Sequence, residues 1–222
     1  MLGGRPHCES QRVTQTRKIG PYQVYRVRDP RNQRVSRLLV GLGFFGVGLG
    51  LSVEADLGVN PWTVFHQGLA ERLPISIGVA IILTGLIILL IFPTIDEPIG
   101  LGTVLNVALI GIFVDVTLAV IPDLSSLPIR ILSLAVAPVL IGLASGFYIG
   151  SGLGPGPRDG IMTALERRGL PVAIARTAVE FTALIIGIVL GGRAGWGTLY
   201  MAGTVGIWVQ FFLRRLRIDT HP

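Results

Sequence analysis

The stretch LGVNPW at residues 57–62 recurs as LGPGPR at residues 153–158, at a shift of 96 positions. Both runs are dense in glycine and proline, so neither can continue an α-helix. An uncharged apolar segment precedes each run, and a short segment follows it, at residues 62–73 and 158–169. The chain therefore contains the same interrupted unit twice, which points to an internal duplication.

Further turn and packing residues superpose at nearly the same shift. The matches at 96 or 95 positions are Gly46 on Gly142, Gly50 on Gly146, Leu69 on Leu165, Gly102 on Gly197, Thr103 on Thr198 and Gly111 on Gly206. Apolar residues match by chance, but turn residues in the same order at one offset do not. We therefore interpret residues 37–122 and 123–217 as two copies of one repeat.

Six apolar stretches are long enough to cross a bilayer as helices, which needs about 20 residues each. They are residues 38–53, 75–95, 98–122, 131–157, 171–192 and 194–213. The pattern predicts an all-α polytopic membrane protein with six transmembrane helices. Because each copy holds three spans, an odd number, the second copy must insert upside down, which gives two inverted three-helix repeats.

The charge distribution predicts the orientation of these spans. The chain is 50% hydrophobic and only 14% charged, with 19 Lys and Arg residues. Nine of the 19 precede residue 38, so anionic lipid is their expected counter-charge, and nucleic acid is not an expected partner. The positive-inside rule then places both termini in the cytoplasm. The tail at residues 1–36 is expected to be basic and disordered, and residues 218–222 form a short C-terminal tail.

The two glycine and proline turns carry the first group of candidate site residues. Asn60 and Trp62 lie in the first turn, whereas Arg158 and Asp159 of the second copy replace Trp62 and Thr63. The short segments after the turns either lie flat at the interface or re-enter the membrane with free N-terminal amides facing a solute. Arg158 and Asp159 either clamp a charged substrate group or form an ion pair that pins two loops together.

Polar residues inside the apolar stretches form the second group. Arg176 and Glu180 are four residues apart, so they share one helix face and can neutralise each other. They mark an internal cavity, a partner or an ion path, unless Arg176 extends to the lipid headgroups. Asp115, its repeat equivalent Gln210 and Asn106 complete the candidates for substrate binding or coupling. Asp115 binds a cation or proton, or serves as a hydrogen-bonding group between helices.

No constellation for catalysis or metal binding is visible in the sequence. His7, His66 and His221 have no ligand-spaced neighbours, and Cys8 is the single cysteine. A thiolate metal cluster needs several cysteines, and a catalytic triad needs grouped Ser, His and Asp residues. We therefore expect neither an enzyme nor a bound cofactor.

The chain resembles the YczE and YitT group of bacterial membrane proteins. The resemblance rests on LGVNPW, on GPRD at residues 156–159, on Arg176 with Glu180 and on the paired Gly-Thr turns, and it extends from about residue 36 to 215. Members of the group often read Pro-Trp-Asp where this chain has Thr63 after Trp62. The resemblance implies the membrane fold and a location in the bacterial inner membrane, but no substrate or catalytic residue.

Three classes of function fit these features. The first is a secondary transporter or exporter of a small solute that works by alternating access between the inverted repeats. The alternatives are a substrate-binding membrane subunit of an ATP-driven importer, and a membrane scaffold or sensor that transports nothing. The expected partners are the lipid bilayer and an unidentified small solute, and a homodimer is left open.

Overall fold

The computed structural model describes residues 17–19, 22–24 and 31–216. Two short antiparallel strands, β1 (Arg17–Ile19) and β2 (Tyr22–Val24), lie in the basic tail and were not predicted. The helix α1 (Arg31–Glu54) begins inside the predicted tail, so the expectation of disorder was wrong for residues 31–36. Residues 17–19 and 22–24 are likewise ordered as strands, and the remaining tail residues, 1–16, 20–21 and 25–30, lie outside the described residues.

Apart from this hairpin the described chain is helical. The long helices are α1, α3 (Ile77–Ile91) with its 3-10 extension η1 (Phe92–Ile95), α4 (Leu101–Val120), α5 (Leu127–Gly150), α7 (Val172–Leu190) and α8 (Trp196–Arg215). The short helices are α2 (Pro61–Arg72) and α6 (Pro157–Arg167). By length and composition, five described helices can cross a membrane: residues 31–54, 77–95, 101–120, 127–150 and 173–190. The sixth predicted span, now α8, is as long as α4 but is not among these five.

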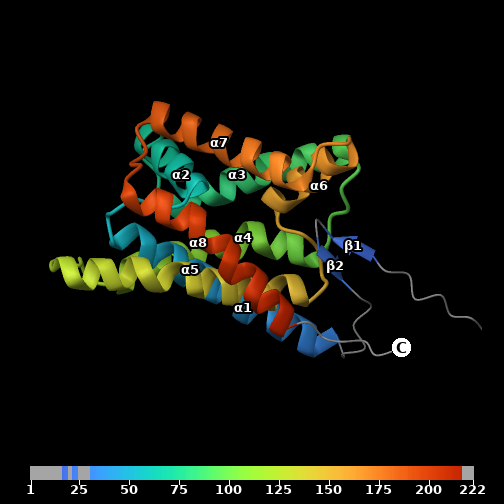
Figure 1. The fold of residues 1–222 in the computed structure, drawn as a ribbon, viewed down its shortest axis with the longest axis horizontal. Helices are drawn as coiled ribbons and strands as arrows, with labels where there is room; N and C mark the ends of the chain where they lie inside the picture. The colour runs from blue at the N-terminus through green and yellow to red at the C-terminus, as the bar shows by residue number, and fades with distance from the viewer. Residues whose placement is uncertain (1–16, 20–21, 25–30, 217–222) are drawn as a thin grey trace, which may run out of the picture.

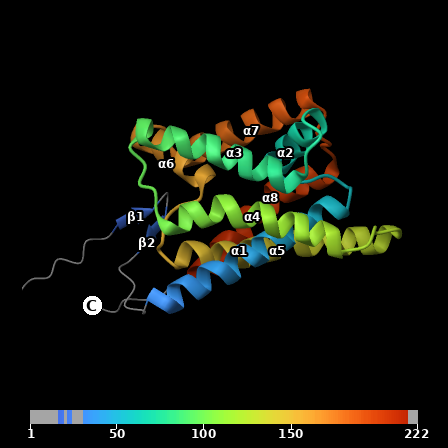
Figure 2. The same cartoon turned by 180° about the vertical axis from the view of Figure 1, so that it is seen from behind.

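The helices form two layers (Figures 1 and 2). One layer holds α1, α4, α5 and α8, and the other holds α2, α3, α6 and α7. The long helices are α1, α3 and α4 in the first copy and α5, α7 and α8 in the second. The first layer therefore contains the first and last long helix of each copy. The second layer contains the short helix and the middle long helix of each copy. The two copies are therefore interleaved, and each contributes half of both layers.

Glycine allows close packing of the first layer. A Cβ added to Gly46 of α1 would lie 2.3 Å from the Cβ of Phe113 in α4. At the equivalent place in the second copy, a Cβ on Gly142 of α5 would lie 2.6 Å from the Cβ of Trp208 in α8. Small residues at such positions let helix backbones approach each other, as is usual in membranes.

Contacts between the two copies occur in reciprocal pairs. The amide of Gly102 donates to the carbonyl of Leu153 at 2.9 Å, and the amide of Gly197 donates to the carbonyl of Leu57 at 2.8 Å. Leu57 corresponds to Leu153, and Gly102 corresponds to Gly197. The two hydrogen bonds are therefore the same contact with the copies exchanged. Gly58 and Gly154 follow the two acceptors and have φ angles of +111° and +135°, which favour glycine.

Two arginines repeat this reciprocity near the helix ends. Arg34 Nε donates to the carbonyl of Ser151 at 2.8 Å, and Arg130 Nε donates to the carbonyl of Ala55 at 2.7 Å. A second guanidinium nitrogen of each arginine reaches the carbonyl of the next residue, at 2.9 and 2.6 Å. Arg34 and Arg130 are therefore equivalent residues that each bind the C-terminal end of the other copy's first helix.

The ends of the short helices make similar contacts, although Arg72 corresponds to Arg168 and not to Arg167 at the shift of 96. Arg72, at the end of α2, donates to the carbonyl of Leu190 at 3.1 Å, and Arg167, at the end of α6, donates to the carbonyl of Ile95 at 2.6 Å. Arg167 also forms an ion pair of 2.7 Å with Glu97. Burial raises the pKa of Glu97, and Arg167 opposes that rise.

The copies differ in how the middle helix meets the last one. In the first copy α3 packs on α4, and a Cβ added to Gly78 would lie 2.2 Å from the carbonyl oxygen of Gly111. In the second copy a Cβ on Gly206, the equivalent of Gly111, would be 3.8 Å from its nearest neighbours, the terminal nitrogens of Arg176. Ala173, the equivalent of the buried Gly78, is exposed. The helices α3 and α4 are therefore in close contact, whereas α7 and α8 are separated near these residues.

Candidate functional site

A cavity of about 120 Å³ lies between the two layers. All eight α-helices contribute to its lining, so both copies surround it. Its apolar lining comprises Phe45, Leu49, Ile81, Ile88, Val107, Ile110, Ile141, Met201, Ala202 and Val205. Its polar lining comes largely from the beginnings of α2 and α6 and from α7. The cavity is therefore amphipathic.

The N-terminal ends of both short helices face this cavity. Asn60 and Pro61 of α2 and Gly156 and Pro157 of α6 are lining residues. Proline suits the first helical turn because its missing amide would have no partner there. The side chain of Asn60 accepts from the amide of Thr63 at 3.0 Å, whereas Gly156 has no side chain with which to cap α6. Both helix ends present positive potential to the cavity.

Three polar atoms on the first turns of α2 have no hydrogen-bond partner among the described residues. They are Trp62 Nε1, Thr63 Oγ1 and His66 Nδ1, and all three residues line the cavity. Thr63 is 1% exposed and His66 is 8% exposed. A buried polar group without a partner costs about 1–3 kcal/mol. Such groups are rare in native proteins, so three on one helix face indicate a place for a ligand or ordered water.

His66 is uncharged in this site. The helix α2 lies outside the five membrane-crossing helices, and burial there lowers the pKa of His66 to about 3, with a further contribution from the positive charge of Arg158. The imidazole therefore offers its unpartnered Nδ1 as a neutral donor or acceptor.

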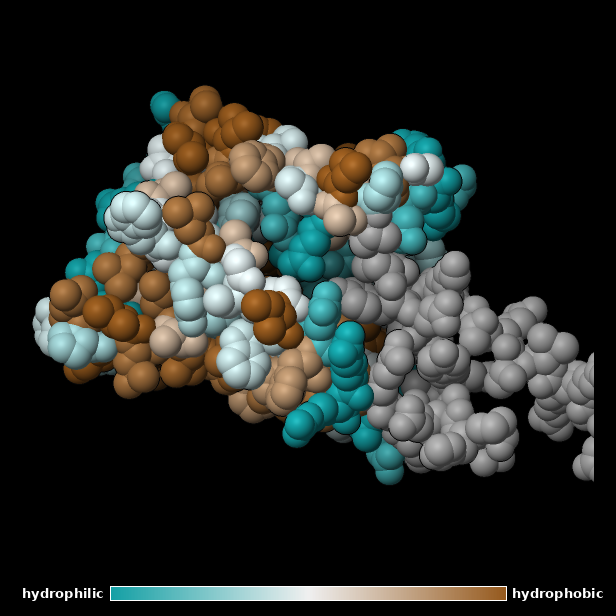
Figure 3. Space-filling model, viewed as in Figure 1, coloured by the Kyte–Doolittle hydropathy of each residue, from teal (hydrophilic) through white to brown (hydrophobic). Residues whose placement is uncertain are grey.

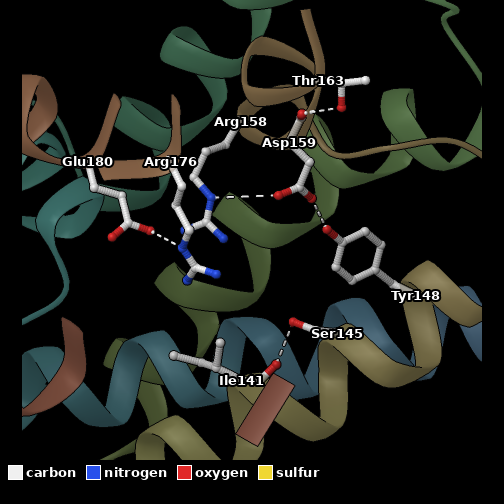
Figure 4. Close-up of polar contacts among 8 residues, drawn as sticks. All are labelled: Ile141, Ser145, Tyr148, Arg158, Asp159, Thr163, Arg176 and Glu180. Atoms are coloured by element: carbon white, nitrogen blue, oxygen red, sulfur yellow. Dashed lines mark hydrogen bonds and ion pairs between the residues drawn. The ribbon is translucent and has the colours of Figure 1, made fainter. Parts of the chain in front are cut away.

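Four charged side chains that line the cavity appear as a row in Figure 4. Arg176 Nε lies 3.2 Å from Glu180 Oε1, and Arg158 Nε lies 3.9 Å from Asp159 Oδ1. The hydroxyl of Tyr148 donates to Asp159 Oδ2. In the view of Figure 4 the guanidinium groups of Arg158 and Arg176 overlap, and the carboxylates of Glu180 and Asp159 are drawn on either side of them. The four side-chain charges balance.

One face of the molecule has a hydrophilic region surrounded by apolar surface (Figure 3). Figure 3 shows a hydrophilic hollow between the α7 side and the α8 side of this face, bordered by apolar surface. The side chains of Arg158 and Arg176 are about one-third exposed. They are therefore accessible to a solute even though each has a carboxylate beside it.

Seven of the nine predicted site residues line the cavity. They are Asn60, Trp62, Asn106, Arg158, Asp159, Arg176 and Glu180. Asp115 and Gln210 do not line it. Gln210 is exposed on α8, away from the cavity lining.

Asp115 lies at the N-terminus of α3 instead. Its Oδ2 accepts from the Ser76 hydroxyl at 2.5 Å, and its Oδ1 accepts from the Gly78 amide at 2.8 Å. Ser76 is the N-cap of α3. A carboxylate stabilises a helix N-terminus by accepting from its free donors and by interacting with the helix dipole. Of the roles considered for Asp115, the geometry therefore favours that of a hydrogen-bonding group between α3 and α4.

We expect Asp115→Asn to lower the stability of the protein by about 1 kcal/mol, the usual value of one hydrogen bond. The amide nitrogen that replaces one carboxylate oxygen cannot accept from Ser76. Thermal unfolding in detergent measures the effect, with the exposed Asp123→Asn as the matched control. Equal unfolding temperatures for Asp115→Asn and the unaltered protein would contradict the capping role.

Sequence reasoning missed four polar residues of the site, namely Thr63, His66, Thr84 and Tyr148. Thr63 was considered only as the residue that Asp159 replaces, and His66 was set aside as an isolated histidine. His66 lies four residues after Trp62 on the same helix face, which was the available signal. Tyr148 contacts Asp159 only because α5 and α6 fold against each other, and no local pattern indicates that. Within the described residues, no group of three or more His, Cys, Asp or Glu side chains is placed to hold a metal ion.

Comparison with known proteins gives a family but no activity. Residues 32–214 match the family model DUF6198, described as a family of unknown function. An uncharacterised protein of Haemophilus influenzae is 34% identical over 81% of this chain and 83% of its own length. The uncharacterised membrane protein YczE of Bacillus subtilis is 33% identical over 78% of this chain and 82% of its own length. No solved structure matches the chain significantly. The resemblance to YczE is therefore confirmed.

Proposed function

Because the chain belongs to DUF6198, a family of membrane proteins without an assigned activity, we propose from its cavity that it is a secondary transporter or exporter of a small solute. The observation that carries the proposal is an amphipathic cavity lined by every α-helix of both copies, with three unpartnered polar side chains among its lining residues. Transporters built from inverted repeats bind their substrates at such a position, between half-helices whose N-termini face the substrate. In this proposal α2 and α6 are those half-helices.

The proposed architecture has six spans, with α8 as the sixth, in two inverted repeats. Reciprocal contacts support a two-fold relation between the copies. Under a two-fold axis, each contact from the first copy to the second is repeated by the equivalent residues from the second copy to the first. The pairs formed by Arg34 with Ser151 and by Arg130 with Ala55 follow this rule. Since each copy would cross the membrane three times, the axis lies in the membrane plane.

The difference between the copies supports alternating access. Contact between α3 and α4 closes one side of the cavity, and separation of α7 from α8 opens the other. In the alternate state the second copy adopts the packing of the first, so that α7 contacts α8 and α3 leaves α4. With both termini in the cytoplasm of a bacterial inner membrane, as the positive charges predict, the described state opens inward.

Cysteine labelling tests this proposal. We expect Ala202→Cys, at the cavity lining, to react with a membrane-impermeant maleimide in both right-side-out and inside-out vesicles, because the cavity opens to each side in turn. Cys8→Ser provides the background without other thiols. Leu90→Cys, which is 78% exposed on an apolar span, should react from neither side. Asp96→Cys and Ser125→Cys mark the inner and outer faces.

Labelling of Ala202→Cys from one side only would contradict alternating access and favour a scaffold or sensor. Labelling of Asp96→Cys from outside would reverse the orientation but leave the transport proposal intact.

A further inference from the structure

We propose that the cavity binds a small organic monoanion, namely a carboxylate attached to a compact apolar body. The inference rests on the proposed function, since it names the substrate class of the same cavity. It is carried by the charge balance, by the donors that face the cavity and by the cavity volume.

The charges of the lining favour one negative charge on the ligand. Arg158 and Arg176 balance Asp159 and Glu180, and His66 is neutral. The N-termini of α2 and α6 each add about half a positive charge by their helix dipoles. The cavity therefore carries about one excess positive charge in a low-dielectric setting. A monoanion neutralises it, whereas a cation would double it and a dianion would reverse it.

Donors suited to an anion are available at the cavity. Trp62 Nε1 can only donate, and it has no partner among the described residues. The guanidinium groups of Arg158 and Arg176, which also line the cavity, likewise only donate. The acceptors Asp159 and Glu180 are already engaged by Tyr148 and the two arginines. A ligand carboxylate accepts strong, charge-assisted hydrogen bonds from such donors.

The volume limits the apolar body of the ligand. An engineered apolar cavity of about 150 Å³ holds one benzene molecule. The cavity described above measures about 120 Å³, which is somewhat smaller, so the apolar body can be at most about one small ring. The apolar side chains that line the cavity, from α1, α3, α4, α5 and α8, would surround this part of the ligand.

Three probes of nearly the same shape test the charge directly. Benzoate is an anion, benzamide is its neutral isostere, and benzamidine is its cationic isostere. We expect calorimetric titration of the purified full-length protein in detergent to give benzoate at least a tenfold lower Kd than either of the other two. Equal or tighter binding of benzamidine or benzamide, or no binding of benzoate, would overturn the proposal.

Variants locate the binding. Trp62→Phe keeps an aromatic ring but removes the donor, and it should weaken benzoate binding several-fold. The double variant Arg176→Gln with Glu180→Gln stays charge-balanced, so it avoids an unpaired charge, and it should weaken benzoate binding at least tenfold. Arg168→Gln, an exposed arginine at the opposite end of α6, is the matched control and should bind as the unaltered protein does. Unchanged benzoate binding in the double variant would overturn the proposal.

The outcomes separate this inference from the transport proposal. Benzoate selectivity together with one-sided labelling of Ala202→Cys would support the ligand class and contradict transport. Two-sided labelling together with a preference for benzamidine would support transport and overturn the ligand class.

Discussion

Gly187→Ala in α7 is expected to cause a large loss of folded protein and a lower unfolding temperature. A Cβ at this residue would lie 2.5 Å from the amide nitrogen of Phe65 and 2.6 Å from its Cα. These are backbone atoms of α2, which cannot rotate away as a side chain can, so α7 must move from α2. Overpacking of a well-packed interior costs about 1–3 kcal/mol or more.

A second glycine in a long helix provides the control for this substitution. Gly203 in α8 has no atom within 4 Å of an added Cβ. Because alanine is a better helix former than glycine, Gly203→Ala should be neutral or stabilising by up to about 1 kcal/mol. Thermal unfolding in one detergent compares the two variants. Similar unfolding temperatures would show that the close approach of α2 and α7 is not needed for stability.

Glu180→Gln is the second substitution expected to have a large effect. It leaves Arg176 without its partner at 3.2 Å inside an otherwise apolar helix. An unpaired charge at such depth costs at least about 2–3 kcal/mol on insertion scales, so the yield of inserted protein and its unfolding temperature should fall.

Removal of both charges should reverse much of this loss. Arg176→Gln combined with Glu180→Gln leaves no charge without a partner, and neutral replacement of a buried pair is often tolerated. Unfolding temperatures of the two single variants and the double variant form a thermodynamic cycle. Additive effects of the two single changes would mean that Arg176 and Glu180 do not interact.

The helix boundaries at the two glycine and proline runs were predictable because these residues stop a helix whatever the rest of the chain does. The glycine and proline runs at residues 57–62 and 153–158 stop one helix and start another, and α2 and α6 begin within one residue of the predicted segments. The start of α1 was missed because Arg31, Arg34 and Arg37 make its first turns look like a polar tail. Arg34 is tied to α5 by the carbonyls of Ser151 and Gly152, a contact that no local pattern shows.

Part of the site was predictable because charged residues inside an apolar segment need a polar environment, such as a cavity. Arg176 and Glu180 are costly in lipid, and the structure places both at the cavity lining. The same reasoning left the role of Asp115 open, because the cost of a charge in lipid alone does not say which partner compensates it. That partner is the start of α3, more than 35 positions earlier in the chain. The charged row of Figure 4 also depends on Tyr148, which only tertiary packing brings to Asp159.

The reciprocal arginines have a thermodynamic consequence. In the alternating-access cycle proposed above, the two end states of a perfectly duplicated molecule would be related by the two-fold rotation and would have equal free energy. Residues without a match in the other copy would therefore set the ratio of the two populations. Two such residues are Asp56, which faces Arg130 and Arg193, and Glu97, which faces Arg167. The side chain of Asp56 is 61% exposed, whereas that of Glu97 is 3% exposed. Salt screens exposed ion pairs more strongly than buried ones, so we expect ionic strength to weaken the pairs of Asp56 more than that of Glu97 and thereby to shift the populations of the two proposed states.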